Sequence, residues 1–124
     1  MLTAPHRLRR AADINRVYSR GRYGRAEHLH IKCLANGLNL SRGVVIVGRK
    51  ISKRAVVRNR LRRQVAAQLA VLWSKVPSGY DLVVTMHADP GAATTAGLNK
   101  QLVQALSAAG LKLGTLSNQE APSV

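Results

Sequence analysis

The stretch "GVVIVGRKISKRAVVRNRLRRQV", residues 43–65, places a short β-branched run directly before a long run of positive charge. Residues 43–48 are typical of a buried strand, because valine and isoleucine pack well on a pleated sheet. Residues 48–63 carry eight Lys and Arg side chains and no Asp or Glu. Such a run of charge could belong to a disordered basic tail, a solvated helix face or a binding surface for a polyanion. The spacing of the apolar residues distinguishes these three possibilities.

Apolar residues recur at helical spacing through and beyond this charge. They lie three or four positions apart, at Val57, Leu61, Val65, Leu69 and Leu72. This period predicts a helix over residues 53–73 with one apolar stripe, interrupted by Gln68. A disordered tail would not keep such a period, and a solvated helix normally mixes charge signs. Because no acid occurs from residue 48 to residue 80, we expect the helix to dock by its stripe and to present its charge to an external anion.

The overall charge balance indicates the class of partner. Twenty Lys and Arg face five Asp and Glu, which gives a net charge of +15 and a pI near 11.6. Such self-repulsion indicates a protein that binds a polyanion. Nucleic acid fits better than an acidic membrane, because no basic amphipathic helix carries large aromatic anchors. After residue 63 only Lys75, Lys100 and Lys112 remain, so the first half is expected to bind and the second half to act as scaffold.

Length and composition predict one domain. The chain has 124 residues, of which 46% are hydrophobic, and this suits a single domain over residues 7–113 with flexible ends at 1–6 and 114–124. Cys33 is the one cysteine, so no internal disulfide can form, which fits a cytoplasmic location. No apolar run approaches the roughly 18 residues of a membrane span, and the N-terminus lacks the apolar stretch of a secretory signal. We therefore expect no membrane partner.

The order of predicted elements indicates the fold class. Helical spacing covers residues 9–21, 53–73 and 94–110, whereas alternation or β-branched content predicts strands over 27–35, 43–48 and 80–87. Residues 36–41 read as a hairpin-type connection because they contain Asn36-Gly37. The result is an α+β domain, a two-layer α/β sandwich with helices on one face of a small central sheet.

The sequence predicts no catalytic residue and no metal ligand. The acids are scattered along the chain, at Asp13, Glu27, Asp81, Asp89 and Glu120, whereas two-metal hydrolysis needs clustered carboxylates. His28, His30 and Lys32 share one strand face and could in principle cleave RNA by acid–base catalysis. In-line attack, however, needs its acid and base on opposite sides of the phosphate. Cys33 is interpreted as a small buried hydrophobe.

Several segments together resemble the bacterial ribonuclease P protein component. The main one is "SRGVVIVGRKISKRAVVRNRLRRQV" (41–65), with a strand ending in paired basic residues, a short loop, an Arg-Asn-Arg helix and further arginines. "LRRAADINRVYSRG" (8–21) is similar to the first helix of that family, and "GYDLVVTMH" (79–87) is similar to its strand after the basic helix. The Leu-rich last helix also fits, so the resemblance covers about residues 7–110.

This resemblance implies a fold and a function. The fold would be of the ribosomal protein S5 domain 2-like type, with a left-handed βαβ crossover around the basic helix. The protein would be a subunit of an endoribonuclease that removes the 5′ leader of precursor tRNA. Its partners would be the catalytic RNA subunit and precursor tRNA. Catalysis would belong to the RNA and its Mg²⁺, and the protein alone would bind no cofactor.

The resemblance also implies two surfaces. The surface for the catalytic RNA would comprise Arg49, Lys50, Lys53, Arg54, Arg58, Asn59, Arg60, Arg62 and Arg63. A cleft for the leader would comprise Ile14, Tyr18, His30 and Lys32. The chain departs from the family where Ile14 replaces a common Phe, and it contains no Phe at all.

Two other classes of nucleic-acid-binding protein would carry a similar positive charge. A ribosomal or ribosome-assembly protein that binds rRNA would carry the same charge and have no link to catalysis. A DNA-binding protein would need a short turn between two helices near the arginines, but a strand is predicted there instead.

Overall fold

A computed structural model describes residue 2, residues 4–91 and residues 94–114. Its elements in chain order are η1 (Ala4–His6), α1 (Ala11–Arg20), β1 (Arg22–Arg25), β2 (Leu29–Ala35), β3 (Arg42–Val47), α2 (Ala55–Leu72), η2 (Trp73–Lys75), β4 (Tyr80–Met86) and α3 (Thr95–Ala108). The expected α+β class is confirmed. The predicted tail covers residues 114–124, and its part beyond Gly114 lies outside the described residues. The flexible ends and the domain bounds stay predictions.

The four strands form one mixed sheet in the order β1-β2-β4-β3. β4 pairs antiparallel with β2 and parallel with β3. The predicted hairpin at 36–41 is therefore wrong, because β4 lies between the strands that this segment connects. β4 occupies the centre because Leu82, Val83 and Val84 are all fully buried, so both faces of this strand need cover. α2 connects parallel strands β3 and β4 in a β–α–β crossover, whose handedness stays a prediction.

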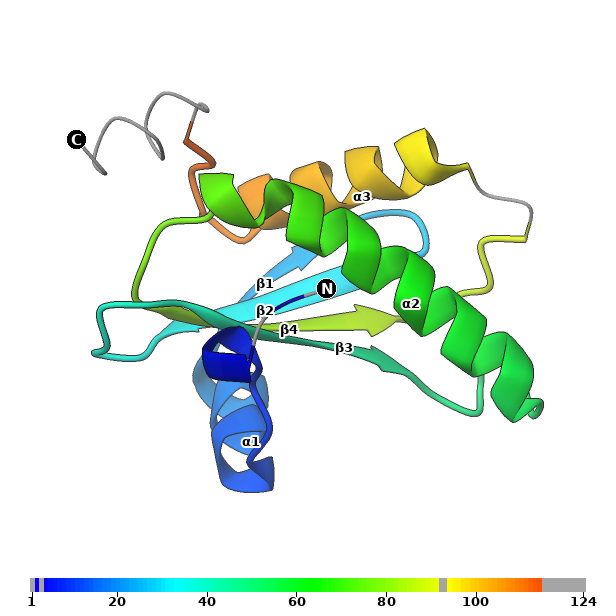
Figure 1. The fold of residues 1–124 in the computed structure, drawn as a ribbon, viewed down its shortest axis with the longest axis horizontal. Coiled ribbons are helices and arrows are strands. Elements are labelled where there is room, and N and C mark those ends of the chain that lie inside the picture. The colour runs from blue at the N-terminus through cyan, green and yellow to red at the C-terminus, as the bar shows by residue number, and fades with distance from the viewer. Residues whose placement is uncertain (1, 3, 92–93, 115–124) are drawn as a thin grey trace.

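Helices cover both faces of the sheet, which corrects the expectation of helices on one face. α2 and α3 pack side by side over one face, and α1 lies against the other (Figure 1). The physical reason is that β4 also turns Val83 to the α1 side, where it packs with Leu8 and Val17. This smaller core holds α1 in place across the sheet from the two longer helices.

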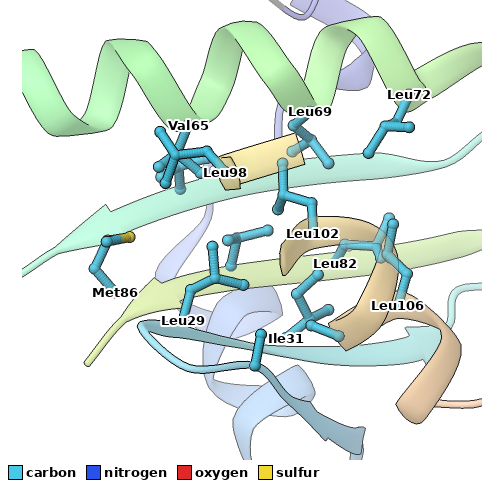
Figure 2. Packing of buried hydrophobic residues seen from close by; sticks show 14 of the residues in the cluster. Leu29, Ile31, Val65, Leu69, Leu72, Leu82, Met86, Leu98, Leu102 and Leu106 are labelled. Carbon is cyan, nitrogen blue, oxygen red and sulfur yellow. The ribbon is translucent and has the colours of Figure 1, made fainter. Parts of the chain in front are cut away.

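The main core lies between the sheet and the α2–α3 layer. Val65, Leu69 and Leu72 of α2 meet the leucines of α3 over the strands (Figure 2). Gln68, which interrupts the predicted stripe, accepts a hydrogen bond from Asn99 Nδ2 at 3.1 Å. The stripe is thus confirmed, and its one polar residue bridges the two helices.

A buried charge network fixes α1 and the sheet edge to one another. Asp81 on β4 is 3% exposed and accepts hydrogen bonds from Arg42 Nε at 2.9 Å and Arg42 Nη2 at 2.7 Å. Asn36 Nδ2 donates to the same carboxylate at 2.9 Å, and Asp13 of α1 lies 3.6 Å from Arg42. Its hydrogen bond to Asp81 raises the pKa of Arg42, so this guanidinium is charged at every relevant pH.

None of the described helices combines the length and the apolar character that a bilayer crossing requires.

Candidate nucleic-acid interface

The loop between β3 and α2, residues 48–54, is held in shape by the first turns of α2. Arg58 Nη1 donates to the carbonyls of Ser52 and Lys53, both at 3.0 Å. Ile51, half-buried, packs against the main core. Arg49, Lys50, Lys53 and Arg54 are exposed on this anchored loop. Arg58 was predicted on the surface for the catalytic RNA, and its geometry adds a structural role: it anchors the loop that carries the four other basic residues.

The outward face of α2 presents guanidinium groups that carry no carboxylate partner among the described ion pairs. Arg60 and Arg63 are exposed, and Arg62 is half-buried. Arg62 Nη1 donates to Asn59 Oδ1 at 2.6 Å, which explains the asparagine between two arginines as a group that orients a guanidinium. The first turn of α2 contains no acid, and its N-cap, Arg54, makes no side-chain cap. Positive side chains at the positive end of a helix dipole leave this end strongly attractive to an anion.

A cavity of about 470 Å³ lies beside these arginines, at the edge of the sheet. Its walls come from the segment before α1, the edge strand β3 and the side of α2 between its buried and exposed faces. They comprise Leu2, Arg7, Leu8, Arg9, Gly43, Val44, Val45, Asn59, Arg62, Arg63, Ala66 and Leu69. The sequence prediction included Asn59, Arg62 and Arg63 but missed Arg7 and Arg9, which lie about fifty positions earlier in the chain and reach the same place through the topology.

On the face of the sheet that α1 covers, the structure brings together three of the four residues predicted for the leader cleft, namely Tyr18, His30 and Lys32. Lys32 Nζ donates to the backbone carbonyl of Tyr18 at 2.7 Å and lies 5.8 Å from the centre of the Tyr18 ring. Tyr18 Oη and Thr85 Oγ1 are hydrogen-bonded at 3.0 Å. Ile14 is half-buried against the smaller core, so its main contact is with the protein itself.

His30 forms an aromatic cluster that the sequence prediction did not include. Its ring stacks on His87 with centroids 5.3 Å apart and lies 5.2 Å from the ring of Tyr23. The two Nδ1 atoms of His30 and His87 are 3.1 Å apart, and His87 Nε2 lies 2.9 Å from the carbonyl of Glu27. Because a carbonyl only accepts, neutral His87 carries its proton on Nε2, and His30 then donates from Nδ1. We name Tyr18, Tyr23, His30, Lys32 and His87 the leader surface, after the leader cleft that the family resemblance predicts.

The charge state of His30 follows from its surroundings. Partial burial, then the nearby His87, Lys32 and Arg25, lower the pKa of His30, so the ring is neutral at pH 7. His28, expected on the same face, instead contacts the α3 side, where Gln101 Nε2 lies 2.9 Å from its Nδ1. The three side chains considered from the sequence as an acid–base cluster therefore do not share all their neighbours, since His28 contacts α3. Cys33 is buried, as predicted, and burial raises the pKa of its thiol.

Two carboxylates in the part of the chain that the structure covers contribute to the fold. Asp13 and Asp81 are both bound to Arg42. Among residues 2, 4–91 and 94–114, no three His, Cys, Asp or Glu side chains gather as a set that could hold a metal ion.

Comparison with known proteins decides among the functions that this basic surface allows. The family model described as Ribonuclease P matches residues 2–110. This chain belongs to the ribonuclease P protein family. Membership makes the protein a subunit of ribonuclease P, the endoribonuclease complex that processes the 5′ end of precursor tRNA, and implies association with the RNase P RNA. The ribosomal and DNA-binding alternatives are thereby set aside.

Individual ribonuclease P proteins agree in sequence and in fold. The ribonuclease P protein component of a Pseudanabaena species is 38% identical over 87 residues, covering 69% of this chain and 75% of that protein. The Azoarcus component is 31% identical and covers 80% of this chain and 82% of that protein. The Staphylococcus aureus RNase P protein structure superposes with a TM-score of 0.74 at 22% identity, covering 93% and 98% of the two chains. The Thermotoga maritima protein gives 0.69 at 24% identity, covering 78% and 91%. These structures confirm the expected S5 domain 2-like fold.

Proposed function

We propose that this subunit binds the catalytic RNA through residues 49–63 and the 5′ leader of precursor tRNA through the leader surface. The observation that carries the first part is the division of α2 into two faces. Leu61, Val65 and Leu69 are buried in the core, while Arg60 and Arg63 are exposed. A helix anchored by one face presents the other at a fixed angle, so the bound RNA meets a rigid array of guanidinium groups, which contact phosphates in bidentate fashion.

Residues 49–54 extend this array toward the end of β3. Arg49, Lys50, Lys53 and Arg54 are exposed and are positioned through the two hydrogen bonds of Arg58. Preorganisation matters because a flexible basic loop would lose conformational entropy on binding. Together with Asn59 and the α2 arginines, these residues form the proposed surface for the catalytic RNA.

The leader surface supports binding of a single strand. Unpaired bases stack on aromatic rings with about 1–3 kcal/mol per base, and Tyr23, 48% exposed, offers such a ring beside the His30–His87 stack. Lys32 supplies positive charge for a leader phosphate. Since the chain has three Tyr, one Trp and no Phe, imidazoles replace part of the aromatic area that the family resemblance implies for phenylalanine.

We assign the cleavage chemistry to the RNA and to Mg²⁺ held largely by its phosphates. The polypeptide contributes binding and orientation, with the tethered carboxylates of Asp13 and Asp81 serving the fold. We place the assembled enzyme in the cytoplasm, in keeping with the single buried thiol of Cys33.

The RNA surface is tested by comparing two double variants with the same loss of charge. Arg60→Ala with Arg63→Ala removes two exposed arginines from α2, and Lys100→Ala with Lys112→Ala removes two exposed lysines from the last third of the chain. Each phosphate contact contributes about 0.7–0.9 to the slope of log K against log salt concentration. We expect the α2 variant to flatten the slope for RNase P RNA by about 1.4–1.8 and the lysine variant to leave it unchanged. Equal flattening of the salt slope in the two double variants would mean that RNA binding depends on net charge alone.

A further inference from the structure

The cavity beside α2 has a chemistry different from that of a simple phosphate site. Its volume of about 470 Å³ lies within the range of roughly 300–1,000 Å³ that is usual for small-molecule sites. Among its lining residues, Val45 and Leu69 are buried and Ala66 is half-buried, so its floor is apolar. Arg7 and Arg63 are exposed and Arg62 is half-buried, so its rim is basic. An apolar floor under a cationic rim matches a ligand that combines a flat hydrophobic body with negative charge.

The sheet edge adds hydrogen-bonding groups to this cavity. The backbone N–H of Leu8 donates to the carbonyl of Gly43 at 3.0 Å, so this carbonyl points away from β4. Backbone groups alternate in direction along a strand. The N–H and C=O of Val45, two residues further, therefore face the same outer edge, where no strand formed by the described residues pairs with β3. A donor and an acceptor side by side suit the hydrogen-bonding edge of a nucleobase.

We propose that this cavity holds one unpaired nucleotide of the RNase P RNA, with its base on the apolar floor and its phosphate on the arginine rim. The Asn59–Arg62 hydrogen bond fixes one guanidinium at the entrance. The inference rests on the proposed function, because α2 must lie against that RNA. It adds recognition of a base to the phosphate contacts of the helix, at a place that the leader surface does not share.

The first test uses the wild-type full-length chain, labelled with ¹⁵N and titrated with AMP. Ribose 5-phosphate at equal ionic strength is the matched control, since it carries the phosphate and the sugar without the base. We expect AMP to shift the amide signals of Val45 and Ala66 saturably and ribose 5-phosphate to leave them in place. Equal shifts from both ligands would reduce the cavity to an anion site, and no shift with AMP would also overturn the proposal.

The second test fills the cavity without changing its charge. Ala66→Leu places a larger side chain on the floor, and Ala67→Leu makes the same change at the adjacent, exposed position. Loss of one base contact corresponds to a change of about ten-fold. We expect Ala66→Leu to weaken binding to RNase P RNA by about that factor with an unchanged salt slope, and Ala67→Leu to bind within about two-fold of wild type.

The outcomes separate this inference from the proposed function. Wild-type affinity of Ala66→Leu for RNase P RNA would overturn the inference, as would a loss confined to a free leader oligonucleotide. Failure of the wild-type chain to bind RNase P RNA would instead contradict the proposed function. If Ala66→Leu does not fold, the AMP titration of the wild-type chain decides the question by itself.

Discussion

Arg58→Ala should affect both folding and RNA binding, because Arg58 holds the loop that carries four other basic residues. Its Nη1 donates to two backbone carbonyls, of Ser52 and Lys53. A hydrogen bond from a charged group contributes about 1.5–3 kcal/mol, and sharing of one nitrogen and partial exposure reduce the sum to about 1–2 kcal/mol. Arginine and alanine have similar helix propensities, so the change tests the loop contacts.

The matched control is Arg63→Ala, which removes an exposed arginine of the same helix. For a 124-residue chain we expect thermal denaturation to show Tm lowered by roughly 3–8 °C for Arg58→Ala and by less than about 2 °C for Arg63→Ala. In RNA titrations, Arg63→Ala should flatten the salt slope by one contact, about 0.7–0.9. Arg58→Ala should flatten it by about two contacts or more, because Lys53 and Arg54 lose their positions with it.

Equal Tm values and equal salt slopes in the two variants would refute this reasoning. Arg58 would then be one phosphate ligand among several, and the loop would owe its shape to other contacts. Protection of the amides of residues 50–54 from hydrogen exchange provides a direct check, since only Arg58→Ala should reduce it.

Three further predictions concern the buried charge, the histidine stack and the leader. Asp81→Asn should lower the free energy of unfolding by about 3 kcal/mol in urea titrations, since it breaks a buried ion pair with Arg42; a loss below about 1 kcal/mol would contradict that account. Because the pKa of His30 is lowered in the folded protein, the unfolded chain gains a proton first, and stability should fall as pH drops below the ordinary histidine value of about 6.5. His30→Gln should flatten this decline, and an unchanged pH profile would argue against it. Tyr18→Ala should weaken binding of precursor tRNA more than binding of mature tRNA, and equal losses would remove Tyr18 from the leader surface.

Helices could be predicted from the sequence because burial of one helix face leaves a local repeat. Leu98, Leu102 and Leu106 are buried as their spacing indicated, and α2 shows the same relation. The contact between Asn59 and Arg62 could also have been predicted from the sequence, since residues three apart lie on one helix surface. β1 was not assigned, because "RYGR" is a short edge strand with one buried position and leaves almost no alternation.

Contacts between distant residues left no local pattern. The partners Arg42 and Asp81 are 39 positions apart, and their pairing depends on β4 entering the sheet between β2 and β3. The same insertion made the hairpin prediction fail. Arg7 reaches the cavity only because residues 7 and 8 run along the edge of β3. The basic helix could thus be found from sequence, whereas the shape of the site beside it depends on topology.

Reconstitution of precursor-tRNA cleavage is the measurement that tests the central claim most directly. The full chain, the cognate RNase P RNA and a precursor tRNA with its leader are combined over a series of Mg²⁺ concentrations. We predict no cleavage by the protein alone, and restored cleavage at the mature 5′ end when the protein joins the RNA at low Mg²⁺. Absence of any stimulation across the whole Mg²⁺ series would contradict the proposal that this subunit binds the catalytic RNA and its substrate.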